Sequence, residues 1–315
     1  MTITRTALLA AALLAALPAA AETTFTVLGS GGGPVVRPDR SQPANLLSVD
    51  GRHIVVDAGD GLSVRLAAKR VRMGDIDEVL ISHLHFDHVA GLLGVLGLRF
   101  QTNPEKPVAI YGPPGTRALV EGMLTGMGPA MEASYGLEGA TVMTPEELVT
   151  VTEIRGGDSF DLGATRVTAA KNSHYSFAHG SEMDRKYESL SFRFDTPDRS
   201  ITYTGDTGWS DAVIELARGT DLLVSELIDL PSVMETVRRT APEHLTGEIE
   251  AHLSAHHVSP DEIGRMAAAA DAGAVVATHL VAGAQITPEN IAGWQSAIRA
   301  HFPGPVAIAE DLQDY

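Results

Sequence analysis

Three histidines and one aspartate lie within six consecutive residues. This arrangement limits the possible fold and chemistry of the chain more than any other feature. The motif consists of His83, His85, Asp87 and His88. It begins one residue after 78–81, which have the composition of a short buried strand. In a loop that leaves a strand, the two histidines at 83 and 85 can face one side. Asp87 and His88 begin the next helix and can point at a second site. Imidazole and carboxylate groups suit first-row metals, so the motif predicts a hydrolytic centre with two metal ions.

Further ligands are expected from other strands, because four side chains of one loop cannot complete two metal sites. His174, Asp206 and His279 each stand at the carboxyl end of a predicted strand. Open α/β sheets place their ligand sites just beyond these strand ends. We therefore expect two divalent cations, with zinc as the first choice and manganese or iron as alternatives.

The composition excludes several classes of protein. The 315 residues contain no Cys, which excludes a disulfide scaffold, a Cys-ligated zinc site and a thiol nucleophile. The formal net charge is −17, and the sequence has no large Lys/Arg cluster to offset it. This charge repels a phosphate backbone, so we expect no nucleic-acid partner. The sequence does not determine an oligomeric state.

The first 21 residues have the order of a secretory signal peptide. Arg5 provides a positive charge, residues 6–17 form an Ala/Leu run, and residues 18–21 supply small residues before Glu22. The apolar run is too short for a spanning helix, so we expect no stable membrane insertion. Cleavage would leave a secreted or periplasmic protein of one domain, residues 22–315. Removal of Arg5 takes the net charge from −17 to −18.

Short apolar runs alternate with longer Ala/Leu/Glu segments, which is typical of an α/β protein with two similar halves. Strands are expected at 25–28, 45–49, 53–56, 79–82, 108–111, 165–169, 190–194, 200–204, 222–224 and 274–278. Helices are expected at 62–70, 89–99, 116–125, 144–149, 210–217 and 260–270. Residues 181–188 and 231–257 fit this pattern poorly and are interpreted as variable loops or lids.

The order of these candidate ligands resembles the metallo-β-lactamase family of dinuclear hydrolases. The resemblance also includes Gly29-Ser30-Gly31-Gly32-Gly33 and the strand end Val55-Val56-Asp57-Ala58-Gly59. It implies an αββα sandwich. It also implies one metal on His83, His85 and His174, a second metal on Asp87, His88 and His279, and Asp206 as a bridge between them.

Within this family the sequence is similar to the branch of ribonuclease Z and exported arylsulfatases. The resemblance implies that His257 stands beside the metals and assists proton transfer, although the adjacent His256 is an alternative match. The sequence shows no clear insertion like the tRNA-clamping arm of ribonuclease Z. Together with the acidic charge and the predicted export, this argues against tRNA as the substrate.

Three further features have alternative interpretations. The Gly-rich segment 29–33 lacks the spacing of a dinucleotide-binding fingerprint and is interpreted as a tight turn at a sheet edge. Asp57 is either a hydrogen-bond acceptor for a ligand histidine or an ordinary turn residue. Glu226 is either a partner of His257 or a surface carboxylate, and the surface interpretation is preferred.

The predicted function is hydrolysis of a small ester by a hydroxide that bridges two metals. Asp87 and Asp206 would fix the hydroxide and the metals, and His257 would protonate the leaving oxygen. The expected substrates are an aryl sulfate or a phosphodiester or phosphotriester. The alternatives are a β-lactam or lactone hydrolase and a non-catalytic exported metal-binding protein.

Overall fold

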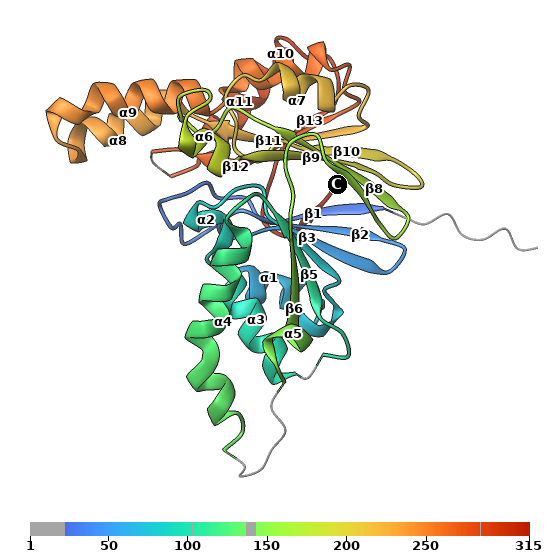
Figure 1. Cartoon of the computed structure of the whole chain (residues 1–315). Coiled ribbons are helices and arrows are strands. Elements are labelled where there is room, and N and C mark those ends of the chain that lie inside the picture. The colour runs from blue at the N-terminus through green and yellow to red at the C-terminus, as the bar shows by residue number, and fades with distance from the viewer. Residues whose placement is uncertain (1–22, 103, 137–142, 284) are drawn as a thin grey trace, which may run out of the picture.

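The structure is a computed structural model that describes residues 23–102, 104–136, 143–283 and 285–315. Two seven-stranded sheets face each other, and helices cover both outer faces (Figure 1). This is the αββα arrangement expected from the sequence. The signal-peptide prediction for residues 1–21 lies outside the described residues.

The first sheet has the order β14-β1-β2-β3-β4-β5-β6. Strands β1 to β3 form antiparallel hairpins, and β3 to β6 run parallel. Its elements are β1 (Thr24–Gly29), β2 (Ala44–Val49), β3 (Arg52–Ala58), α1 (Leu62–Ala68), the 3-10 helix η1 (Met73–Asp75), β4 (Glu78–Leu80), α2 (Phe86–Val89), α3 (Leu92–Gln101), β5 (Val108–Gly112), α4 (Thr116–Ala133), α5 (Pro145–Leu148), β6 (Val149–Glu153) and the terminal β14 (Gln313–Asp314).

The second sheet repeats this plan in the order β13-β12-β11-β10-β9-β8-β7. Strands β7 to β10 are antiparallel, and β10 to β13 are parallel. Its elements are β7 (Ser159–Leu162), β8 (Thr165–Lys171), α6 (Glu182–Lys186), β9 (Leu190–Asp195), β10 (Ser200–Tyr203), α7 (Asp211–Leu216), β11 (Leu222–Ile228), α8 (Leu230–Thr240), α9 (Glu243–His256), α10 (Pro260–Ala269), β12 (Val275–Val281), α11 (Pro288–Arg299) and β13 (Val306–Ile308).

The apolar core has three layers, one between the two sheets and one between each sheet and its covering helices. In β3, Ile54 and Val56 pack between the sheets, whereas Val55 faces the helices of the first half. In β12, Val276 packs between the sheets and Val275 faces the helices of the second half. Strand side chains alternate between faces, so both sheets bury apolar residues on both sides.

Two segments differ from the sequence-based expectation. Residues 181–188 and 231–257 were expected to be loops, but they contain α6, α8 and α9. Helices α8 and α9 pack against each other and project from the body of the molecule (Figure 1). The Asp229 carboxylate caps α8 by accepting a hydrogen bond from the Ser232 N–H at 3.3 Å. Helix α9 has no buried residue, so its sequence does not need the regular spacing of apolar residues that core elements show.

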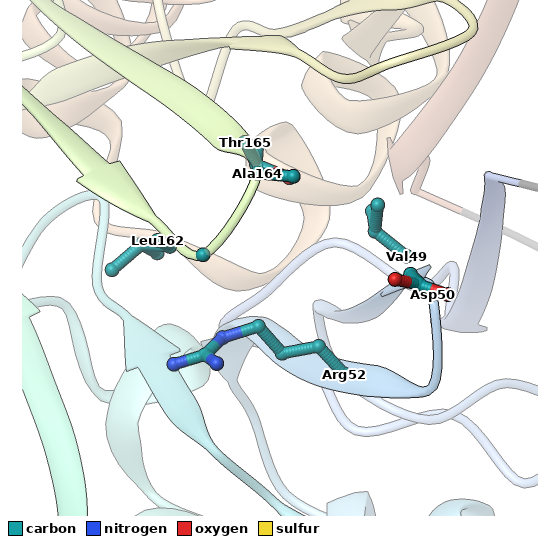
Figure 2. A pocket seen from close by; sticks show the side chains of 7 residues that line it. Val49, Asp50, Arg52, Leu162, Ala164 and Thr165 are labelled. Carbon is teal, nitrogen blue, oxygen red and sulfur yellow. The ribbon is translucent and has the colours of Figure 1, made fainter. Parts of the chain in front are cut away.

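A hollow of about 120 Å³ lies between two hairpin turns, the β2–β3 turn and the β7–β8 turn (Figure 2). Its lining residues are Val49, Asp50, Arg52, Leu162, Gly163, Ala164 and Thr165. The hollow is at the amino end of β3, whereas the candidate ligands follow carboxyl ends of strands. It is therefore separate from the predicted metal centre.

No helix in the described parts of the chain is long and apolar enough to cross a membrane.

Arg99 of α3 is completely buried and joins the helix to the segments that precede β4 and β5. Its guanidinium donates hydrogen bonds to the carbonyl oxygens of Met73 at 2.6 Å, Ile76 at 3.1 Å and Lys106 at 2.7 Å.

Arg99→Met would leave three carbonyls without this donor. We expect the free energy of unfolding to fall by about 3 kcal/mol, measured by urea denaturation. The control Arg218→Met changes an exposed guanidinium and should leave the urea midpoint unchanged. Equal midpoints for both variants would contradict this role of Arg99.

Candidate metal centre

The loop after β4 places its four candidate ligands at one edge of the molecule. His83 and His88 are completely buried, and His85 is exposed. His85 precedes the short helix α2, and its carbonyl accepts a hydrogen bond from the His88 N–H at 3.0 Å. The turn keeps His88 close to the preceding ligands, and its ring lies 4.0 Å from that of His83.

Three strands of the second sheet complete the cluster. His174 follows β8, Asp206 follows β10, and His279 lies within β12; all three are buried. The pairing register of β11 and β12 shifts at His279, whose φ of 44° is in the left-handed region. A bulge of this kind redirects a side chain, and a positive φ in a histidine stores backbone strain. The local distortion of β12 thus turns His279 into the site.

The ligand atoms form several overlapping close groups, and two of these groups have the members that the family resemblance implied. The ligand atoms of His83, His85 and His174 lie within 4.8 Å of one another. Those of Asp87, His88 and His279 satisfy the same limit.

Asp206 lies between the two groups. Its Oδ1 is 3.3 Å from His88 Nε2, and its Oδ2 is 3.2 Å from His279 Nε2. The same Oδ2 is 3.8 Å from His174 Nε2 and 3.9 Å from His83 Nε2. One carboxylate therefore faces ligands of both groups, as a bridging ligand must.

The chemistry of these side chains fits divalent cations. Among the described residues, His83 Nε2, His88 Nε2 and Asp206 Oδ1 are buried polar atoms without a hydrogen-bond partner. Burial lowers the pKa of His83 well below its ordinary value and that of His174 to about 3, so both imidazoles are neutral. Burial opposes the charge on His88 and His279 as well, but the Asp206 carboxylate raises the pKa of both. Neutral imidazole is the form that binds metal. Lone pairs directed into one buried space are unfavourable unless a cation accepts them.

Asp57, in β3, supports this centre through a network of hydrogen bonds. It is completely buried, and its Oδ2 lies 2.8 Å from His88 Nδ1. The Ser82 N–H and the Tyr203 hydroxyl also donate to this carboxylate, at 2.7 and 2.8 Å. Because Asp57 accepts from Nδ1, His88 presents Nε2 to the cluster. Of the two interpretations of Asp57, the hydrogen-bond acceptor is the one that the structure shows.

The structure also distinguishes His257 from His256. His257 Nδ1 lies 2.7 Å from Glu226 Oε2, and the His257 ring contacts that of His174 at 5.0 Å. His256 instead bonds the Ser173 carbonyl through Nδ1 at 2.6 Å. Glu226 is only 1% exposed, so the preferred interpretation of a surface carboxylate was wrong. Burial opposes the charge on His257, but the Glu226 carboxylate raises its pKa to about 9.

The Gly-rich segment contributes a wall of the site, which the sequence interpretation missed. The Gly33 N–H donates to Asp87 Oδ2 at 3.0 Å, and a Cβ on Gly33 would lie 2.1 Å from that oxygen. Only glycine permits this approach. A run of three glycines after a strand signalled a close backbone contact but not its partner.

Tyr175 is a second residue that the sequence interpretation missed. Its ring contacts those of His83, His85 and His174 at 5.9, 5.4 and 5.7 Å. Adjacency to His174 was the only signal for it in the sequence. Tyr175 therefore packs beside the exposed side of the first ligand group.

Comparisons with known proteins agree with this geometry. A family model described as "Beta-lactamase superfamily domain" matches residues 52–280. A protein named Ribonuclease Z from Mycobacterium bovis (strain BCG / Pasteur 1173P2) is 28% identical over 291 residues, covering 91% of this chain and 96% of that protein. A protein of the same name from Mycobacterium marinum (strain ATCC BAA-535 / M) is 29% identical over 295 residues, with coverages of 91% and 96%.

Solved structures share the fold. The metallo-beta-lactamase fold protein YhfI from Bacillus subtilis has a TM-score of 0.68 at 20% identity, covering 93% of this chain and 98% of that one. The short form of human tRNase Z has a TM-score of 0.59 at 22% identity, with the same coverages of 93% and 98%.

These relatives overturn one expectation from the sequence. The net charge led to the prediction of no nucleic-acid partner, and the resemblance to one branch of the family led to the prediction of a small ester substrate, but relatives similar along nearly the whole chain are named Ribonuclease Z. The physical error was to apply the charge of the whole molecule to one site. The potential inside a cleft depends on local charges, and bound cations are the largest of these.

The family model covers well over half of the sequence, and the His/Asp groups at the strand ends have the chemistry of a metal centre. The chain belongs to the beta-lactamase superfamily and is a metal-dependent hydrolase with the metallo-β-lactamase fold.

Proposed function

We propose that this protein hydrolyses phosphodiester bonds of RNA at a centre of two divalent cations. The observation that carries the proposal is the position of Asp206 between two groups of ligands, with His257 beside it. The relatives named Ribonuclease Z, at 28–29% identity over 91% of the chain, support RNA as the substrate class.

One cation would be held by His83, His85 and His174, and the other by Asp87, His88 and His279, with Asp206 shared. When bound, two divalent cations supply positive charge that lowers the pKa of water and stabilises negative charge on a phosphoryl group. Nitrogen and oxygen ligands suit zinc, with manganese or iron as alternatives. A protein of this fold, PqqB from Methylobacterium extorquens, is described as Zn(2+)-bound.

The protein's own residues would position the reacting groups and supply a proton. Hydrolysis adds a water oxygen to phosphorus and breaks one P–O bond, so the departing oxygen needs a proton. Glu226 binds Nδ1 of His257, and His257 lies with Asp206 and His174 in one group whose ligand atoms are within 4.8 Å. The opposite edge of the His257 ring is thus available to give a proton to the leaving oxygen. Glu226 acts as a positioning residue for this ring.

We also propose that the protein is exported. Residues 1–21 have the order of a signal peptide, with a charged start, an apolar run and small residues before Glu22. We infer that the protein functions in a secreted or periplasmic form, with residues 22–315 as one domain.

Substitution of Asp206 tests the metal centre. Asp206→Ala should lose bound metal and reduce turnover of an oligoribonucleotide to near background, because both ligand groups lose the shared carboxylate. Metal content is measured by mass spectrometry, and circular dichroism checks folding. Asp206→Asn keeps the size of the side chain and serves if Asp206→Ala does not fold. Full activity in either variant would refute the shared role.

His257→Gln should retain metal but lower kcat by roughly a hundredfold, because it removes a proton donor and no metal ligand. The matched control is His256→Gln, which changes the neighbouring histidine. Equal kcat values for His257→Gln and the unmodified protein would contradict the proton-transfer role. Failure of the unmodified, metal-loaded protein to cleave RNA would contradict the proposed function itself.

Asp57→Asn should weaken metal affinity by roughly tenfold to a hundredfold, because the amide no longer fixes His88 as a carboxylate does. Competition with a chromogenic chelator measures this affinity. The control Asp60→Asn alters an exposed carboxylate three residues further along. If the two variants bind metal equally well, Asp57 does not support the centre.

Expression of the full chain with its first 21 residues tests export. The mature protein should be recovered outside the cytoplasm with Glu22 as its amino-terminal residue, determined by mass spectrometry. Recovery of only the intact chain from the cytoplasm would refute the proposal.

A further inference from the structure

A row of aromatic side chains leads away from the exposed edge of the metal centre. It consists of Tyr175, Phe177 and Tyr187 and is called the aromatic row below. The ring of Tyr175 is 5.4 Å from that of His85, the ring of Phe177 is 5.2 Å from Tyr175, and that of Tyr187 is 6.4 Å from Phe177. His85 is the exposed member of its ligand group, so the row begins where solvent reaches the centre.

Backbone contacts hold the row in place. The Tyr175 hydroxyl accepts a hydrogen bond from the Leu84 N–H at 3.1 Å, next to His83 and His85. Tyr187 packs against Gly115, where a Cβ would lie 3.0 Å from the ring. All three rings are half-buried, so each is fixed by the protein yet retains accessible surface. Such preformed aromatic surfaces bind planar groups with little loss of conformational entropy.

A lysine ammonium group lies at the outer end of the aromatic row. Lys186 Nζ lies 5.1 Å from the centre of the Tyr187 ring. Among the described residues, no carboxylate forms an ion pair with Lys186, whereas the nearby Lys171 is paired with Asp184 at 2.6 Å. Lys186 is exposed and can therefore contact an anion.

We propose that the aromatic row binds unpaired bases of a single-stranded RNA segment next to the bond that is cleaved, and that Lys186 contacts its backbone. This inference rests on the proposed function. Planar apolar groups joined by phosphates match rings and a cation in one row, and proteins bind single strands by stacking bases on aromatic side chains beside basic groups. An apolar peptide would use the rings but leave Lys186 and the metal centre without partners.

Binding of a phosphorothioate-linked oligoribonucleotide to the metal-loaded protein, followed by fluorescence anisotropy, tests the row. A matched oligonucleotide with abasic positions keeps the backbone but cannot stack. The unmodified protein should bind the base-containing strand about tenfold more tightly than the abasic strand. Phe177→Leu keeps an apolar side chain without a ring and should lose most of this preference.

Two other variants serve as comparisons. Tyr135→Leu removes an aromatic ring that is 59% exposed near the end of α4 and belongs to neither the row nor the metal centre, so the preference should persist. Lys186→Gln should weaken binding of both strands to a similar extent and reduce its dependence on salt.

The outcomes separate the two proposals. If Phe177→Leu retains the full preference for bases, or if the unmodified protein binds neither strand, the aromatic row is not an RNA-binding surface. Cleavage of ordinary RNA without any base preference overturns the row alone. Base-dependent binding that Phe177→Leu abolishes, without cleavage of RNA, overturns the proposed function and leaves the binding role of the row intact.

Discussion

The burial of a carboxylate among imidazoles is the interaction on which the rest of this structure depends. Asp206 is 2% exposed, and His83, His88, His174 and His279 around it are at most 2% exposed. Taking so many polar groups out of water without matching hydrogen bonds is costly. The arrangement is favourable only when a cation accepts the lone pairs, so metal binding and the local fold of this edge are thermodynamically linked.

Each half of the sandwich supplies some of the residues of the metal centre, and neither half contains all of them. The first sheet provides the loop after β4 and the supporting Asp57, and the second provides His174, Asp206 and His279. Two residues of this region, Asp57 and His279, adopt a positive φ. Surrounding hydrogen bonds hold these conformations. This is expected for residues whose side-chain direction is required at the site even though the backbone conformation is unfavourable. At their opposite, amino ends, β3, β8 and β10 are joined to antiparallel neighbours by hairpin turns.

The sequence predicted those features that depend on local spacing. The motif at residues 83–88 and the polar residues at other strand ends predicted which side chains the structure brings together, because carboxyl ends of parallel strands meet at one edge. The partner of Gly33 and the burial of Glu226 depend on contacts between distant segments, which no local pattern encodes. Helix α11 was missed although Thr287 and Pro288 form a start signal and Ile291, Trp294 and Ile298 have helical spacing. Net charge misled the prediction of partners because it averages over the whole surface.

A crystal structure of the metal-loaded protein, with anomalous diffraction recorded at the absorption edge of the bound metal, tests the role of Asp206 most directly. Two anomalous peaks are expected, one on either side of Asp206. One peak should contact His83, His85 and His174, and the other should contact Asp87, His88 and His279. A single peak, or two peaks without Asp206 between them, would contradict the central claim that this carboxylate joins two metal sites.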